Sequence, residues 1–270
     1  MELYFLIAAG IFGAIVGSFI NALSYRFNTG RGMGGRSYCD TCGHVLSPLD
    51  LVPIFSYLFL RGRCRYCSAK ISIQNPLVEV VAALLSVLIY IKYPIWGETS
   101  FEITSYSFWF VVWMTLLFVV VYDLRHTIIP LVCSVLLALL ALIALFFDPQ
   151  TLSFVMPPLW SLLAGPILAS PLFLLSLVSG GRWMGWGDSG LELSIGWFLG
   201  LAAGASALML SFWSGAIIGV GLLLFSRVRW QRKTPQLTMR SEIPFAPFLV
   251  LGMFLAYFFH VDFFSTFFFF

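Results

Sequence analysis

Long apolar runs separated by short polar breaks constrain the fold of this chain more than any other feature. Eight such runs lie near 3–24, 76–95, 106–122, 128–147, 155–179, 191–208, 210–226 and 245–268. A helix needs about 20 apolar residues to cross a bilayer core. Soluble domains carry about 25% charged residues, whereas this chain carries 10%. We therefore expect an all-α polytopic membrane protein with about eight transmembrane helices.

The polar segment between the first two runs divides the chain. It suggests a first transmembrane helix at 1–25, a cytoplasmic loop domain at 26–75 and a transmembrane core at 76–270. The first run lacks the basic start and the small-residue cleavage site of a signal peptide, so we expect it to remain as a membrane helix. Only Ser211 and its neighbours separate the sixth and seventh apolar runs.

Basic residues gather on one side of this predicted topology. Seven of the 15 lysines and arginines lie in the first long loop, at Arg26, Arg31, Arg36, Arg61, Arg63, Arg65 and Lys70. Seven more follow the third, fifth and seventh runs, at Arg125, Arg182, Arg227, Arg229, Arg232, Lys233 and Arg240. The positive-inside rule makes that side cytoplasmic, so both termini are expected outside.

Asp123 and Asp188 stand where apolar runs meet polar turns on that side, Asp188 within Gly185-Trp186-Gly187-Asp188. Ionisable groups at membrane depth are costly and are usually retained for function. Two carboxylates that share a site cannot both ionise cheaply, so one can take a proton from water while its protonated partner polarises a scissile carbonyl. We interpret them as a catalytic pair supported by Gly185 and Gly187, which permit close backbone approach. The alternative is two helix-end residues without chemistry.

Other functional classes find less support. The three histidines, His44, His126 and His260, form no evident pair with a serine or cysteine nucleophile, and the sequence contains no His-Glu-x-x-His pattern. His126 follows Asp123 by three residues and is either a modulator of that carboxylate or an interfacial bystander. A transporter or proton-conducting module that uses the aspartates as a relay stays open.

Two Cys-x-x-Cys pairs, Cys39/Cys42 and Cys64/Cys67, lie in the first long loop with 21 residues between them. Two such knuckles supply four thiolates to one tetrahedral ion and leave no open position, which is typical of structural zinc. A pair of disulfides is less compatible with a cytoplasmic loop, and tetrahedral sulfur also suits iron. Both stay as alternatives. Cys133 lies within an apolar run and is expected to be a packing residue.

The motifs of the chain also follow one another in a specific order. They are Gly17-Ser18-Phe19-Ile20-Asn21, the two cysteine pairs, Asp50-Leu51-Val52-Pro53, Pro76 with Glu79, Asp123 with Ile129-Pro130, Gly185-x-Gly187-Asp188, and Ile243-Pro244-Phe245-Ala246-Pro247-Phe248. This ordered set resembles the type IV prepilin peptidase (leader peptidase/N-methyltransferase) family over most of the chain.

That resemblance implies an intramembrane aspartyl endopeptidase with Asp123 and Asp188 as catalytic residues. The family removes the short basic leader of prepilins and pseudopilins at the cytoplasmic side of the bacterial inner membrane. Such substrates and the lipid bilayer are the expected partners, with no nucleic acid. Members with the four-cysteine loop commonly methylate the new N-terminus with S-adenosylmethionine. Glu79 is our candidate for binding that cofactor and orienting the amine, although it can equally be a helix N-terminal residue paired with the macrodipole.

One position departs from the family pattern. The second aspartate motif normally continues Gly-x-Gly-Asp-x-Lys-Leu, whereas Gly190 replaces the lysine here. A cation beside the pair would favour an ionised carboxylate, and Arg125 or Arg182 is an alternative source of that charge. We favour an active enzyme. The alternative is an inactive or altered-specificity homologue that binds pilin-like helices.

Overall fold

The computed structural model describes residues 2–28, 35–95, 100–148, 153–228 and 244–264. The chain forms two compact units, Met1–Val121 and Tyr122–Phe270. Apart from one two-stranded hairpin, every regular element among the described residues is a helix, which confirms the predicted all-α class. The predicted division at residues 25 and 75 stays a prediction.

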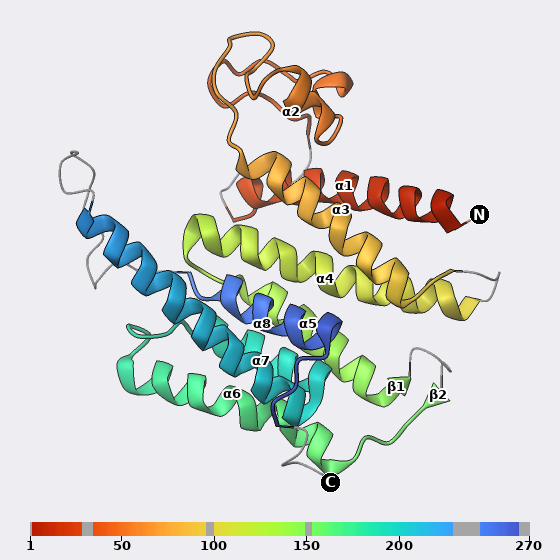
Figure 1. Cartoon of the computed structure of the whole chain (residues 1–270), viewed down its shortest axis with the longest axis vertical. Coiled ribbons are helices and arrows are strands. Elements are labelled where there is room, and N and C mark those ends of the chain that lie inside the picture. The colour runs from red at the N-terminus through yellow and green to blue at the C-terminus, as the bar shows by residue number, and fades with distance from the viewer. Residues whose placement is uncertain (1, 29–34, 96–99, 149–152, 229–243, 265–270) are drawn as a thin grey trace. The chain divides into compact units, whose positions relative to one another are not determined.

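Helices α1 (Glu2–Arg26) and α3 (Gln74–Lys92) pack side by side in the first unit (Figure 1). Their backbones approach closely, because a Cβ atom added at Gly13 would lie 2.5 Å from the carbonyl oxygen of Ala82. Small residues at such an interface let membrane helices gain van der Waals contact. The α1–α3 pair therefore depends on glycine in α1.

Helix α4 (Ser100–His126) contributes its residues up to Val121 to the same unit. The Ser86 hydroxyl of α3 lies 2.8 Å from the Tyr106 hydroxyl of α4. The rings of Phe12 and Phe110 pack with centroids 4.9 Å apart. A polar contact and an aromatic contact thus attach α4 to the α1–α3 pair.

The cysteine module, residues 35–73, connects α1 to α3. It carries the 3-10 helix η1 (Pro48–Leu51) and the short helix α2 (Phe55–Phe59). Isolated β-bridges, Tyr38 with Val45 and Arg63 with Lys70, close the two turns that hold the cysteine pairs. Figure 1 shows the module as a compact group of loops at the end of the α1–α3 pair.

The described part of the second unit contains the end of α4 and four further helices. The long helix α7 is its centre, because α5, α6 and α8 all pack against α7. Strands β1 and β2 pair antiparallel between α5 and α6, with Phe147 opposite Phe154. The elements are α5 (Leu131–Phe146), β1 (Phe147–Asp148), β2 (Ser153–Phe154), α6 (Leu159–Ser179), α7 (Trp186–Val228) and α8 (Ala246–Phe259).

Two of the predicted apolar runs, 191–208 and 210–226, fall on α7, which is interrupted at a different place from the one predicted. The break lies at Gly200, with φ 77° and ψ −180°, a conformation that only glycine adopts readily. The prediction of a break near Ser211 is wrong. Ser211 is buried within the helix, where its hydroxyl donates to the Ala207 carbonyl at 2.7 Å. A serine that satisfies its hydroxyl in this way need not end a helix.

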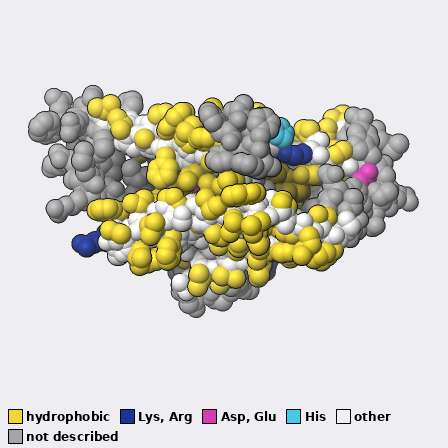
Figure 2. Space-filling model, turned by 90° about the horizontal axis from the view of Figure 1, so that it is seen from below, with side chains coloured by type: hydrophobic (Ala, Val, Ile, Leu, Met, Phe, Trp, Pro, Cys, Tyr) yellow, Lys and Arg dark blue, Asp and Glu magenta, His cyan; other side chains and the backbone are white. Residues whose placement is uncertain are grey.

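Five of the described helices, α1, α3, α4, α6 and α7, are long and apolar enough to cross a membrane. Helices α5 and α8 are apolar but shorter, with 16 and 14 residues. In the view of Figure 2, hydrophobic side chains cover most of the described surface. Exposed apolar surface of this extent suits lipid rather than water. Several cations behind the predicted orientation lie outside the described residues: Arg31, Arg229, Arg232, Lys233 and Arg240.

The substitution Gly13→Val tests the close packing of α1 on α3. We expect overpacking to destabilise the protein by about 2–3 kcal/mol, because a valine Cβ would collide with the α3 backbone. The measurement is the thermal unfolding midpoint of the purified protein. Gly10→Ala is the matched control on the same helix, since its Cβ would lie 3.4 Å from the nearest atom, of Val87. Equal midpoints for the two variants would contradict this packing.

Candidate functional site

Asp188 lies in the first turn of α7 and is 8% exposed. Its Oδ2 atom accepts a hydrogen bond from the Gly185 N–H at 3.0 Å, and its own N–H donates to the Gly185 carbonyl at 3.2 Å. Since α7 begins at Trp186, Asp188 occupies the third helical position and caps the residue before the helix, as an acidic side chain does in a capping box. The carboxylate orientation is therefore fixed by the start of α7.

Asp123 lies in the last turn of α4 and is 4% exposed. Its Oδ2 atom accepts a hydrogen bond from the Ala246 N–H at 3.1 Å, across 123 positions of sequence. Ala246 is the first residue of α8, and the first amides of a helix have no partner within it. Asp123 thus satisfies one of these donors and ties the end of α4 to the start of α8.

The turn after Asp123 packs against the start of α7. A Cβ atom added at Gly187 would lie 2.6 Å from the Ile129 Cβ, so Gly187 is needed for this contact. The two aspartates are close enough for the charge of Asp123 to act on Asp188. Among the described residues, each carboxylate uses Oδ2 for a backbone N–H, and neither Oδ1 atom has a hydrogen bond. The structure thus brings the two predicted catalytic residues together with one free oxygen each.

Ser176 of α6 holds the loop that precedes α7. Its fully buried hydroxyl lies 3.0, 3.1 and 3.3 Å from the carbonyl oxygens of Leu172, Met184 and Gly185. Sequence reasoning missed this residue, whose only signal was a serine within an apolar run. It also missed the role of the Ala246 backbone, which carried no signal beyond its place in the last motif.

Two positions of α7 beyond Asp188 have contrasting surroundings. A Cβ atom at Gly190 would lie 3.4 Å from the Ser134 Cβ, so position 190 faces α5. Glu192 is fully buried, and within the described part of the chain neither of its carboxyl oxygens has a hydrogen-bond partner. Sequence reasoning missed Glu192 too, although an acid within the sixth apolar run was a usable signal.

Two side chains considered as modifiers of the aspartates contact other residues. The Arg182 Nε–H donates to the Ser179 carbonyl at 3.2 Å. The His126 ring packs on the Tyr122 ring at a centroid distance of 4.4 Å. Both side chains are thus engaged with near neighbours in sequence.

The two cysteine pairs of the first unit have the same local structure. The N–H groups of Gly43 and Ser68 donate to the carbonyl oxygens of Cys39 and Cys64 at 2.8 and 2.9 Å. Gly43 and Ser68 both have positive φ, 69° and 59°. Each pair therefore forms the same tight turn, which directs two sulfur atoms toward one point.

The four sulfur atoms of Cys39, Cys42, Cys64 and Cys67 lie within 4.8 Å of one another. The Sγ atoms of Cys39 and Cys67 are 3.8 Å apart, a separation that suits a tetrahedral ion with Zn–S bonds of about 2.3 Å. Backbone hydrogen bonds from Cys42 and Thr41 lower the pKa of Cys39 to about 6, whereas at Cys67 a lowering backbone hydrogen bond from Ala69 is outweighed by desolvation and the neighbouring cysteines, which raise the pKa to about 12. All four cysteines are free rather than disulfide-bonded. The residues fit a bound metal ion.

Asp50 joins the second cysteine pair to the rest of the module. It accepts hydrogen bonds from the Ser47 hydroxyl at 2.8 Å, the Arg65 Nε–H at 2.6 Å and the Tyr66 hydroxyl at 3.2 Å. Desolvation raises the pKa of Asp50, but the hydrogen bonds from Ser47 and Arg65 outweigh it and hold the pKa below its usual value. Because Arg65 and Tyr66 stand between the two cysteines of the second pair, the metal site and Asp50 are mechanically linked.

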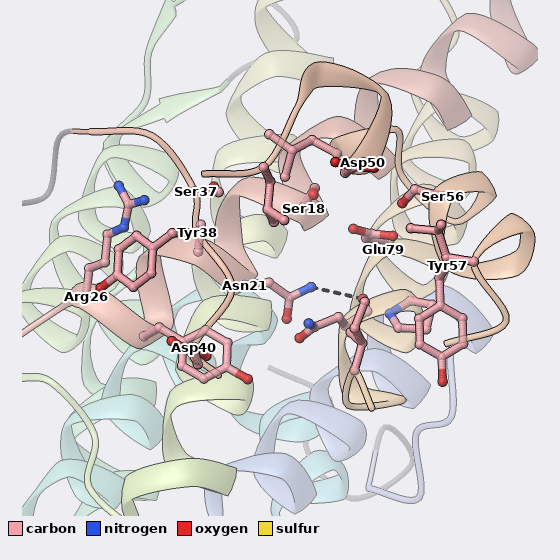
Figure 3. A pocket seen from close by; sticks show the side chains of 18 residues that line it. Ser18, Asn21, Arg26, Ser37, Tyr38, Asp40, Asp50, Ser56, Tyr57 and Glu79 are labelled. Carbon is pink, nitrogen blue, oxygen red and sulfur yellow. Dashed lines mark hydrogen bonds between the residues drawn. The ribbon is translucent and has the colours of Figure 1, made fainter. Parts of the chain in front are cut away.

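A cavity of about 210 Å³ lies between the cysteine module and the adjoining ends of α1 and α3 (Figure 3). The first cysteine knuckle supplies part of its wall, since Asp40 lines it together with Asp50. The cavity lining includes Ser18, Asn21, Tyr25, Tyr38, Asp40, Asp50, Tyr57 and Glu79.

Glu79 borders this cavity from α3 and is 9% exposed. Its Oε2 atom accepts the Ile54 N–H at 2.7 Å, and the Ser18 hydroxyl also donates to the carboxylate. Ile54 has φ 63° and ψ −52°, and the Phe55 N–H donates to the Pro53 carbonyl at 2.6 Å. This is a γ-turn, which is strained for a β-branched residue. Strained backbone of this kind is concentrated at functional sites, and here it directs an amide to Glu79.

Comparison with known proteins places this geometry in a family. Residues 11–93 match the model described as Bacterial Peptidase A24 N-terminal domain. The chain is 34% identical over 242 residues to the prepilin leader peptidase/N-methyltransferase of Aeromonas salmonicida (strain A449), covering 82% of this chain and 70% of that protein. It is 33% identical over 255 residues to the protein of the same name from Bacillus subtilis (strain 168), covering 92% and 91%. The chain belongs to the prepilin leader peptidase/N-methyltransferase family.

Membership of this family confirms the resemblance carried by the ordered motifs. The matched N-terminal domain contains the four cysteines and Glu79, whereas Asp123 and Asp188 lie beyond it. The Bacillus subtilis relative covers enough of the chain to include both aspartates. No solved structure matches this chain.

The variants Cys39→Ser and Cys67→Ser test the metal site. Purified wild-type protein should contain about one metal ion per chain, and each variant much less, because loss of one of four thiolates weakens binding strongly. Elemental mass spectrometry gives both the identity and the amount of the metal. Cys133→Ser is the matched control, since Cys133 is buried in α5 outside the cluster. Full occupancy in either cluster variant would show that these cysteines are not ligands.

Proposed function

We propose that this chain is an intramembrane aspartyl endopeptidase that cleaves prepilins or pseudopilins, with Asp123 and Asp188 as its catalytic pair. The observation that carries this proposal is the pairing of two buried carboxylates, each anchored through Oδ2 to a backbone N–H and each with an unbonded Oδ1. Family membership supplies the class of reaction, since relatives are named prepilin leader peptidases.

In the proposed reaction, the ionised aspartate takes a proton from a water molecule while the water oxygen attacks the scissile carbonyl carbon. The protonated aspartate donates its proton to the carbonyl oxygen, which gives a tetrahedral diol. Collapse of this intermediate breaks the C–N bond. The leaving amine receives the proton taken from water, and one hydroxyl proton of the diol returns to the other aspartate. The pair ends in its starting state.

The proposed substrate is the basic leader of a prepilin joined to an apolar helix. We propose, from the distribution of lysines and arginines, that both aspartates lie at the cytoplasmic surface of the bacterial inner membrane and that both termini lie outside. A leader on that side would present its cleavage site at the depth of the helix ends that carry Asp123 and Asp188.

The second proposed activity is methylation of the new N-terminal amine by S-adenosylmethionine at the cavity beside Glu79. The cofactor carries a sulfonium cation, which acidic and aromatic side chains attract. Asp40, Asp50 and Glu79 supply acids, and Tyr38 and Tyr57 supply rings. When bound, the cofactor provides the methyl group. The Glu79 carboxylate would accept a hydrogen bond from the attacking amine and orient its lone pair.

We further propose that the metal is zinc and that its role is structural. Four sulfur ligands close the coordination shell and leave no position for substrate. Because Asp40 lies within the first knuckle and Asp50 is bonded to the second, loss of the ion is expected to disturb the cavity wall.

The position of Gly190 favours an active enzyme over an inactive homologue that only binds pilin-like helices. This residue faces Ser134 of α5. It takes no part in the hydrogen bonds that hold Asp123 and Asp188. Loss of the usual lysine therefore leaves the support of the pair intact.

The substitutions Asp123→Asn and Asp188→Asn test the peptidase mechanism. Each keeps the size of the side chain but removes its ability to exchange a proton, so leader removal should fall by at least about 1,000-fold. The assay follows a Gly-Phe type prepilin in membranes by the mass of both fragments. Glu102→Gln, at the other end of α4, is the control and should cleave normally. Cleavage that survives either aspartate change would rule out the paired mechanism.

The substitution Glu79→Gln tests the methylation site. Glutamine can still accept the Ile54 N–H through its amide oxygen, but it lacks the negative charge that orients an amine. Methylation should fall by about 100-fold, while leader removal continues in the same sample. The readout is the methyl mass on the processed pilin. A fully methylated product would exclude Glu79 from this step without affecting the peptidase proposal.

A further inference from the structure

Helix α2 of the cysteine module has an apolar outer face and a polar inner face. Phe55, Leu58 and Phe59 are 61, 64 and 84% exposed. They occupy positions i, i+3 and i+4, which lie on one side of a helix. Ser56 and Tyr57 line the cavity from the other side. The outer face has no covering element among the described residues of the chain.

Three cations adjoin this apolar face in sequence. Arg61 and Arg63 follow α2 directly, and Lys70 pairs with Arg63 through a β-bridge. All three side chains are exposed. Within the described residues none of them has an ion pair or a hydrogen bond through its side chain. An apolar helix face bordered by unpaired cations is the composition of a segment that lies on an anionic membrane surface.

The membrane is also within reach of this face. The module is joined at both ends to helices that are long and apolar enough to cross a bilayer, α1 and α3. Directly before and within the first turn of α3, Ile73 and Leu77 are 74 and 59% exposed. Exposed apolar side chains thus occur both on the module and at the start of α3. Tethering at two points makes surface contact an intramolecular event of high effective concentration.

We propose that the outer face of α2 docks on the anionic lipid surface of the bilayer, with Phe55, Leu58 and Phe59 inserted at the interface and Arg61, Arg63 and Lys70 against lipid phosphates. Docking fixes α2, whose inner face forms part of the cavity wall. The cavity is thereby held at headgroup level, where a chain end that emerges from an apolar helix would be presented.

A photo-reactive side chain at position 59 tests this contact directly. The full-length protein carrying Phe59→p-benzoylphenylalanine is placed in vesicles of neutral lipid with or without about one-third phosphatidylglycerol, illuminated, and analysed by mass. We expect lipid adducts, enriched in phosphatidylglycerol. The same probe at Tyr57, on the inner face, should give few lipid adducts. Adducts to another protein or a second copy, or none at all, would overturn the proposal.

The cations are tested in the same assay by Arg61→Gln combined with Arg63→Gln. Each basic residue contributes about fivefold to binding of anionic lipid, so the preference for phosphatidylglycerol should fall by at least about tenfold. Arg36→Gln, elsewhere in the module, is the matched control and should keep the preference. Thermal unfolding midpoints establish that the variants fold. An unchanged preference in the double variant would overturn the proposed contact between these cations and lipid phosphates. Neither assay depends on peptidase or methylation activity.

Discussion

Backbone N–H groups that bind buried carboxylates are the interaction on which both candidate sites depend. Asp123 accepts from Ala246, Asp188 from Gly185, and Glu79 from Ile54. A buried carboxylate without such a donor carries a large desolvation cost. Each bond therefore stabilises the side chain and also fixes its direction. For the two aspartates it engages only one oxygen, so that the other can contact water or an amide.

These bonds also explain how much of the site could be predicted from the sequence. Asp123, Asp188 and the four cysteines stood out as candidates because ionisable or metal-binding side chains are rare in an apolar chain, and the type of side chain itself indicates the chemistry it can perform. The partners of the carboxylates were not evident. Ala246 and Ile54 act through the backbone, which every residue except proline offers equally. Only the fold selects which amide is used, so no residue type marks it.

The roles of the glycines were likewise only partly predictable from the sequence. The Gly-x-Gly-Asp motif predicted close backbone approach but not which group would approach. In the structure, Ile129 occupies the space beside Gly187. At the interruption of α7, the reverse happened: a glycine acts where the sequence suggested a polar residue. Polarity indicated Ser211, yet Gly200 interrupts α7. A serine can bond its own helix, whereas the combination of φ 77° and ψ −180° at position 200 is one that only glycine adopts readily.

The resemblance to the family led us to expect a lysine at position 190, and the consequence of having Gly190 there follows from the geometry of α7. Successive residues turn by about 100° around a helix, so position 190 lies nearly opposite Asp188, on the side of Ser134. A lysine there would reach the aspartates only by folding back along the helix. Its charge would act on the pair through space rather than through the bonds to Gly185 and Ala246. Its absence therefore changes the electrostatic setting of the two aspartates and leaves their hydrogen bonds to Gly185 and Ala246 unchanged.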